Sequence, residues 1–170
     1  MRRHTAEIVW DRGNAEFLDN RYSRAHEILF DGGLRVMGSS SPQNVPPPMS
    51  VPGYMDPEEA LVASVSSCHM LVFLYLASKA GFMVDAYRDH AAGYVDEIAP
   101  GKPAVTRIVL RPAIAFSGAR LPTPSEFDEL HRSAHENCYI ANSIKAEIRI
   151  EPERIAGLRS EPPADPGYMS

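Results

Sequence analysis

A run without a single charged side chain, residues 60–78, constrains the fold of this chain more than any other feature. The run is long enough to cross a bilayer, but it contains four serines and a histidine, and the sequence has no second run like it. We therefore expect a helix of a soluble protein, buried on nearly every side. Because a chain of 170 residues has trouble burying one helix all round, we expect a second subunit to cover part of it. Its apolar residues recur at helical spacing: Leu61, Val65, Cys68, Val72 and Leu76.

The residues around this run mark the ends of the helix. Asp56 is a suitable N-cap, and Pro57 fits the first helical position. Glu58 and Glu59 suit the positive end of the helix dipole. Gly81 supplies the C-terminal stop.

The remaining segments predict an α+β fold. Residues 7–37 read as three short strands, with a hairpin turn at 31–33. Residues 41–57 hold six prolines and predict a stiff loop, either a linker or a wall over a pocket. Two strand-like segments, 82–98 and 104–116, follow the helix.

The C-terminal third predicts a second helix and a last strand. A capping box from Thr123 to Glu126 opens the helix, and one face of it carries Phe127, Leu130, Ala134 and Cys138. The strand covers residues 145–151. We expect one domain over residues 1–151 and a loose, proline-rich tail over residues 152–170.

Charge and the N-terminal residues narrow the function class. The formal net charge of -5 argues against non-specific binding to nucleic acids. The basic N-terminal residues are not followed by the apolar stretch of a secretory signal, so we expect a cytoplasmic protein that does not insert into a membrane. Cytoplasmic thiols are normally reduced, which favours a catalytic or metal-binding role for the two cysteines over a permanent disulfide.

Cys68 needs a cation from elsewhere in the fold if it is to react. It lies about 16 Å from the start of its helix, beyond the reach of the helix dipole. Without a cation it is a small buried hydrophobe. Arginine suits the role because it is always charged and has several donors, and Arg21 and Arg24 open a strand that could approach the central helix.

Glu58 could hold such an arginine through a bidentate pair, or simply complement its helix terminus. Glu58 and Cys68 are about 15 Å apart along one helix, so one arginine cannot easily contact both. Two antiparallel copies of the helix would bring Glu58 of one chain near Cys68 of the other.

The second helix offers an alternative of a different class. His131, His135 and Cys138 share one face and, with Cys68 or His69, could bind a transition metal or small ligand. The spacing matches no established metal motif, and polar core histidines are the commoner interpretation.

The segments DPEEALVASVSSCHM and HENCYIANS, with the long helix between them, resemble the OsmC/Ohr family of osmotically inducible and organic hydroperoxide resistance proteins. The resemblance runs from about residue 10 to 151. It implies antiparallel sheets wrapped around two central helices in an intertwined homodimer.

The same resemblance implies a thiol-dependent peroxidase that reduces organic hydroperoxides, with no metal or other cofactor. Cys68 would be the attacking thiolate, Cys138 the resolving thiol, and a dithiol the reductant. Glu58 would orient the active-site arginine, for which Arg24 fits best and Arg21 remains open.

His69 and Tyr139 depart from the pattern of many peroxidase members and, with YSRAH and CYIANS, resemble an OsmC-like subgroup. A stress-response dimer with little peroxidase activity is therefore an alternative.

Overall fold

The computed structural model describes residues 1–153, which form two compact units, Met1–Leu61 and the chain from Val62 onward. Each unit is described by itself. The single domain expected over residues 1–151 stays a prediction. The expected tail falls outside the described residues except for its first two positions.

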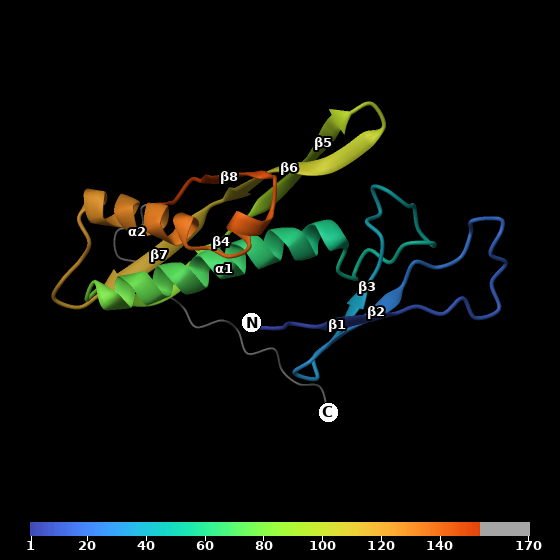
Figure 1. Ribbon diagram of the computed structural model, residues 1–170, viewed down its shortest axis with the longest axis horizontal. Helices are drawn as coiled ribbons and strands as arrows, with labels where there is room; N and C mark the ends of the chain where they lie inside the picture. Colours follow the sequence, from blue (N-terminus) through green and yellow to red (C-terminus); the bar gives the residue numbers. More distant parts are fainter. Residues whose placement is uncertain (154–170) are drawn as a thin grey trace. The chain divides into compact units, whose positions relative to one another are not determined.

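The first unit contains a three-stranded antiparallel sheet (Figure 1). β1 (Ala6–Val9) pairs with β2 (His26–Phe30), and β2 pairs with β3 (Arg35–Gly38). Gly33, with φ of 84°, closes the β2–β3 turn, where it donates its N–H to the carbonyl of Phe30 at 2.9 Å. The three predicted strands and the predicted hairpin turn are confirmed.

The proline-rich segment between β3 and α1 contains turns and no helix or strand, as predicted. It folds back on the end of β3, where the buried Ser39 hydroxyl accepts the N–H of Val51 at 3.0 Å. Its Met49 carbonyl accepts the N–H of Arg24 at 2.8 Å. The loop therefore fixes the backbone just before β2.

Helix α1 (Pro57–Lys79) begins and ends as the sequence predicts. The Asp56 carboxylate accepts the N–H of Glu59 at 2.7 Å, and the Glu59 carboxylate accepts the N–H of Asp56 at 3.2 Å. This reciprocal box satisfies two backbone donors that the first turn would otherwise leave free. Gly81, at φ of 78°, follows the last turn.

Only one stripe of α1 is buried, at every fourth residue: Val65, His69, Phe73 and Ala77. Leu71 and Tyr75 are 61% and 60% exposed. The expectation of burial on nearly every side is therefore wrong for a single chain. Within residues 1–153, α1 is the one helix long and apolar enough to cross a membrane, and core helices of soluble proteins commonly meet the same test.

Between α1 and α2 the second unit has four strands where the sequence suggested two. β4 (Met83–Asp89) pairs antiparallel with β7 (Pro112–Ser117), and β5 (Ala92–Ala99) forms a hairpin with β6 (Lys102–Leu110). The breaks are only one or two residues long, so the alternation of side chains runs through them unnoticed. At one break the Asp89 carboxylate accepts the N–H of Arg111 at 2.6 Å, which holds the chain where it bends.

The last elements complete this unit. Helix α2 (Pro124–Glu136) starts with the predicted capping box between Thr123 and Glu126. It ends before Cys138, which lies in the turn leading to the short 3-10 helix η1 (Ala141–Ser143). β8 (Glu147–Ile150) then pairs with β6 in parallel, so this sheet is mixed rather than purely antiparallel.

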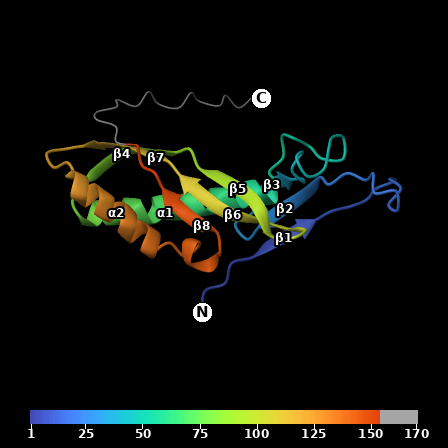
Figure 2. The same ribbon diagram turned by 90° about the horizontal axis from the view of Figure 1, so that it is seen from above.

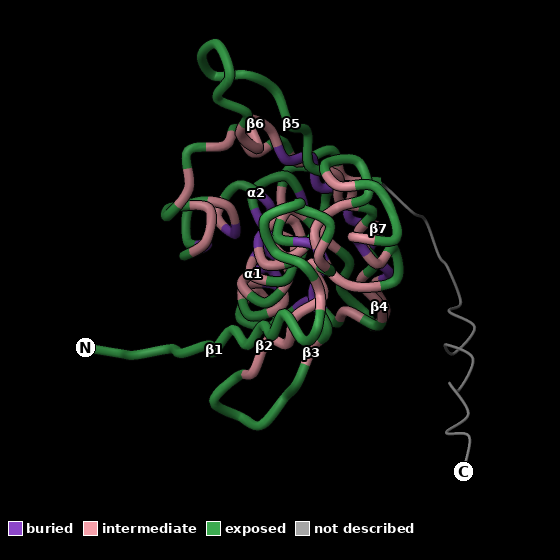
Figure 3. The backbone as a smooth tube through the Cα atoms, turned by 90° about the vertical axis from the view of Figure 1, so that its right-hand side faces the viewer, coloured by how far each residue is buried: buried purple, intermediate pink, exposed green. Residues whose placement is uncertain are grey.

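Helices α1 and α2 lie side by side in both views (Figures 1 and 2), and the core of the unit lies between them and β7. Buried segments gather there (Figure 3). The predicted α+β class is confirmed. The core residues are Phe73, Ala77, Phe82, Ile114, Phe127, Leu130 and Ala134.

Candidate functional site

The structure brings the two cysteines together. Cys68 lies near the middle of α1, and Cys138 follows α2, because the apolar faces of the two helices pack on each other. Both are free thiols, and they lie near enough for the Cys68 side chain to raise the pKa of Cys138. Packing of the two helices thus brings together cysteines that are 70 positions apart in the sequence.

The two thiols have different environments. Cys138 is 1% exposed, whereas Cys68 is half-buried. Burial raises the pKa of Cys138 to about 11, and the neighbouring Cys68 side chain adds to this effect. A thiol with that pKa is almost fully protonated at pH 7, so Cys138 is poorly suited to attack first.

The candidate arginine and glutamate both lie in the first unit, with separate partners. The Arg24 guanidinium bonds to Asn20 and Tyr22, and the Glu58 carboxylate accepts the side-chain amide of Asn44 at 3.0 Å. Among the residues described, no ion pair joins Arg24 to Glu58. Arg21 is exposed and Arg24 half-buried, which favours Arg24 as the ordered cation.

Two histidines beside the thiols form a pair that the sequence did not predict. The Nε2 atom of His69 lies 3.0 Å from the Nδ1 atom of His131, and both side chains are buried. Burial lowers the pKa of His69 to about 3 and that of His131 to about 4, so both rings are neutral at pH 7. The sequence brought His131 and His69 together only as possible members of a metal or ligand site, and it did not predict the direct contact between their rings.

The alternative metal site finds no support in the described part of the chain. Residues 1–153 contain no group of three or more His, Cys, Asp or Glu side chains able to hold a metal ion. His69 and His131 direct one ring nitrogen each at the other. Together with His135 and Cys138 they therefore do not form a ligand set.

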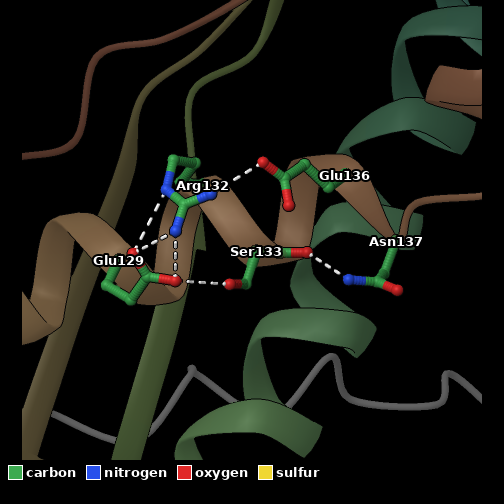
Figure 4. A network of polar contacts seen from close by, with 5 residues as sticks. All are labelled: Glu129, Arg132, Ser133, Glu136 and Asn137. Atoms are coloured by element: carbon green, nitrogen blue, oxygen red, sulfur yellow. Dashed lines mark hydrogen bonds and ion pairs between the residues drawn. The ribbon is translucent and has the colours of Figure 1, made fainter.

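The outward face of α2 is a solvated charge network (Figure 4). Arg132 bonds to Glu129 and, at 2.8 Å, to Glu136, one turn away on either side. Such exposed i,i+3 and i,i+4 pairs contribute a few tenths of a kcal/mol each. The buried side chains of α2 are Phe127, Leu130, His131 and Ala134.

Comparison with known proteins gives a family match. The model of the family described as OsmC-like protein matches residues 51–153. Among curated proteins, none matches the chain significantly.

Solved structures resemble the chain over most of its length. An OsmC-like protein of unknown function from Vibrio cholerae is 48% identical, with a TM-score of 0.87 over 90% of this chain and 100% of that one. An organic hydroperoxide resistance protein from Elizabethkingia anophelis has a TM-score of 0.64 at 17% identity, covering 89% of this chain and 94% of that one. A third, an organic hydroperoxide resistance protein of Bacillus subtilis, has a TM-score of 0.62 at 17% identity, covering 88% and 98%.

Proposed function

The chain belongs to the family of OsmC-like proteins, and from that premise we propose that it is a thiol-dependent peroxidase that reduces organic hydroperoxides to alcohols. The observation that carries the proposal is the contact between Cys68 and Cys138. A half-buried thiol beside a fully buried, protonated one is the pairing that an attacking and a resolving cysteine need. Relatives of this fold named for organic hydroperoxide resistance support the substrate class.

The reaction has three steps that balance. The Cys68 thiolate attacks the terminal oxygen of the hydroperoxide, the O–O bond breaks, and the alkoxide takes a proton from solvent to leave as the alcohol. This gives a sulfenic acid on Cys68. The Cys138 sulfur then attacks the sulfenic sulfur; the hydroxyl leaves with the Cys138 proton as water, and a disulfide forms. A dithiol reduces it by exchange and becomes a disulfide itself.

Arg24 and Glu58 have supporting roles in this proposal. The guanidinium of Arg24 stabilises the Cys68 thiolate, and Glu58 supplies a carboxylate near that guanidinium in the assembled protein. The assembly proposed is a homodimer, because the exposed apolar side chains of α1 need a cover that one chain does not provide. We place the reaction in the cytoplasm, where reductants regenerate the thiols.

The decisive experiment is a peroxidase assay on the wild type, Cys68→Ser and Cys138→Ser, with cumene or tert-butyl hydroperoxide and a dithiol. We expect no turnover in Cys68→Ser. Treated with peroxide in the absence of the dithiol, Cys138→Ser should react once, stoichiometrically, and stop at the Cys68 sulfenic acid. Peptide mapping of the wild type treated with peroxide and no reductant should show a Cys68–Cys138 disulfide.

Other outcomes select the alternatives. No turnover by the wild type, or equal turnover by Cys68→Ser, would overturn the peroxidase proposal. A wild-type dimer without turnover would favour a stress-response protein of little activity, as the Vibrio cholerae relative of unknown function leaves open.

A further inference from the structure

The side chain of Arg24 is held by two neighbouring residues of its own segment. Its Nη1 donates to the carbonyl of Asn20 at 3.1 Å and to the carbonyl of Tyr22. Its Nη2 donates to the side-chain oxygen of Asn20 at 2.7 Å. The guanidinium carbon also lies 3.9 Å from the centre of the Tyr22 ring, within cation–π range.

Asn20 and Tyr22 together form a cradle around the Arg24 guanidinium, and all the groups with which they contact it are neutral. Carbonyl oxygens and an aromatic face orient a guanidinium without adding a negative charge beside it. Three of the five N–H donors point at these oxygens. The remaining two, on Nε and Nη2, have no hydrogen-bond partner among residues 1–153 and are available to an anion.

The backbone conformation of Asn20 makes these contacts with Arg24 possible. Asn20, at φ of 59°, is the only non-glycine residue with a positive φ in the described part of the chain. That conformation costs most residues free energy and suits asparagine. It allows the backbone carbonyl and the side-chain oxygen of Asn20 to contact the same guanidinium.

Aromatic side chains anchor the cradle in turn. Tyr22 stacks on Phe17, with ring centres 4.7 Å apart, and meets Trp10 edge-on at 5.3 Å. The indole N–H of Trp10 donates to the carbonyl of Ser23 at 2.8 Å. The segment that carries Arg24 is therefore held both by the aromatic cluster and by the loop that accepts its backbone N–H.

We propose that Asn20 and Tyr22 are positioning residues that hold Arg24, with its charge intact, in the geometry that activates Cys68. The proposal rests on the role of Arg24 in the proposed function. It assigns the orientation of the arginine to its own segment, whereas Glu58, bonded to Asn44, is at most a second support. Asn20 and Tyr22 act through Arg24 and do not contact the peroxide.

The test measures how fast Cys68 reacts with iodoacetamide across pH, in full-length protein carrying Cys138→Ser so that one thiol reports. We expect Tyr22→Leu and Asn20→Gly each to slow alkylation at pH 7 by about three- to thirty-fold, and to move the profile to higher pH. Asn20→Gly keeps the positive φ, so it removes the side-chain oxygen without backbone strain. Tyr22→Phe keeps the aromatic ring under the guanidinium and should show the same alkylation profile as the protein with Tyr22.

Two further variants separate positioning from structure. Val36→Ala removes apolar contact on β3, outside both the aromatic cluster and the segment that holds Arg24; it should lower thermal stability and leave the alkylation profile in place. In an Arg24→Ala background, Tyr22→Leu should have no additional effect on alkylation, because its action passes through the arginine.

The outcomes also distinguish the role of Asn20 and Tyr22 from the role of Arg24 in the proposed peroxidase reaction. If Arg24→Ala leaves the profile of Cys68 unchanged, the role of Arg24 in the proposed function is wrong. If Arg24→Ala shifts the profile while Asn20→Gly and Tyr22→Leu do not, the arginine is active and the cradle proposal is overturned. A shift in Tyr22→Leu that persists without Arg24 would overturn it as well.

Discussion

The imidazole rings of His69 and His131 are parallel to within 1°, and their facing nitrogens, Nε2 and Nδ1, lie 3.0 Å apart. One ring donates and the other accepts, so the pair is satisfied at this contact only when both rings are neutral or one proton is shared. The outer nitrogens, Nδ1 of His69 and Nε2 of His131, are buried and have no partner in the described part of the chain. Adding a proton to either ring therefore places a charge in the core.

This pair makes the stability of the fold depend on pH. Unfolded histidine binds a proton below about pH 6.5, whereas burial lowers the pKa of folded His69 to about 3 and of His131 to about 4. Between these values the unfolded state binds more protons, so acid favours unfolding. The stabilisation that the two neutral rings give the folded state is complete above about pH 7. Between about pH 6.5 and the folded pKa of each ring, the free energy of unfolding falls by about 1.4 kcal/mol per histidine for each pH unit.

Urea unfolding between pH 7.5 and 5 measures the effect. His131→Gln keeps a polar partner for His69 and removes one titrating ring, so it should flatten the dependence on pH. His135 and Asp128, the other titratable groups that act on the pair, remain in place. Replacing the exposed His90 by Gln is the matched control and should leave the slope unchanged; equal slopes in both variants would contradict the assignment.

The buried thiol should resist alkylation. Because Cys138 is 1% exposed and burial raises its pKa to about 11, iodoacetamide at pH 7.5 should modify Cys68 and leave Cys138 free until the protein unfolds. Mass spectrometry of tryptic peptides from native and urea-unfolded protein checks this. Equal labelling of the two cysteines in the native protein would show that Cys138 is accessible and refute the difference in environment.

The exposed face of α1 should mediate self-association. Leu71 is 61% exposed in the uncharged stretch 60–78 of α1, so Leu71→Asp should convert a dimer to monomers by burying an unpaired charge at the interface. Light scattering after size exclusion measures the mass. Leu121, 58% exposed on a loop, supplies the control, since Leu121→Asp should remain dimeric. A monomeric wild type at micromolar concentration would contradict the dimer.

Gly93 on β5 allows helix α1 to approach the sheet. A Cβ atom at this position would lie 2.5 Å from Cγ2 of Val62. Gly93→Ala should therefore lower the free energy of unfolding by about 1–3 kcal/mol, and Val62→Ala in the same protein should recover much of the loss. Gly53→Ala adds its Cβ in open space and should cost little. If Val62→Ala does not recover the stability lost in Gly93→Ala, the loss does not come from a clash with Val62.

The capping box of α2 should stabilise the helix that precedes Cys138. The Thr123 hydroxyl accepts the N–H of Glu126 at 3.3 Å, and the Glu126 carboxylate accepts the N–H of Thr123 at 2.8 Å. Thr123→Ala should lower the free energy of unfolding by about 1 kcal/mol in urea titrations. Ser125→Ala changes an exposed residue of the same turn and should have no comparable effect. Equal losses in the two variants would argue against the cap.

The sequence by itself determined the local elements. Asp56, Gly81 and Thr123 set helix ends through short-range hydrogen bonds and backbone preferences, and these signals are complete within a few residues. Spacing placed Cys138 and His131 on an apolar face. The breaks at Arg111 and at residues 90–91 do not appear in the sequence pattern, because interruptions of one or two residues leave it almost continuous.

Only the tertiary structure decided which of these residues meet. The contact between Cys68 and Cys138, the His69–His131 pair and the fit of Gly93 against Val62 each join residues far apart in the chain, and packing of α1 on α2 and β5 creates them. The Asn20–Tyr22 cradle is local in sequence, yet the sequence does not reveal it. Its contacts with Arg24 depend on the positive φ of Asn20 and on the directions of the backbone carbonyls. Sequence pattern records the face on which a residue lies; the free energy of packing decides what that face contacts.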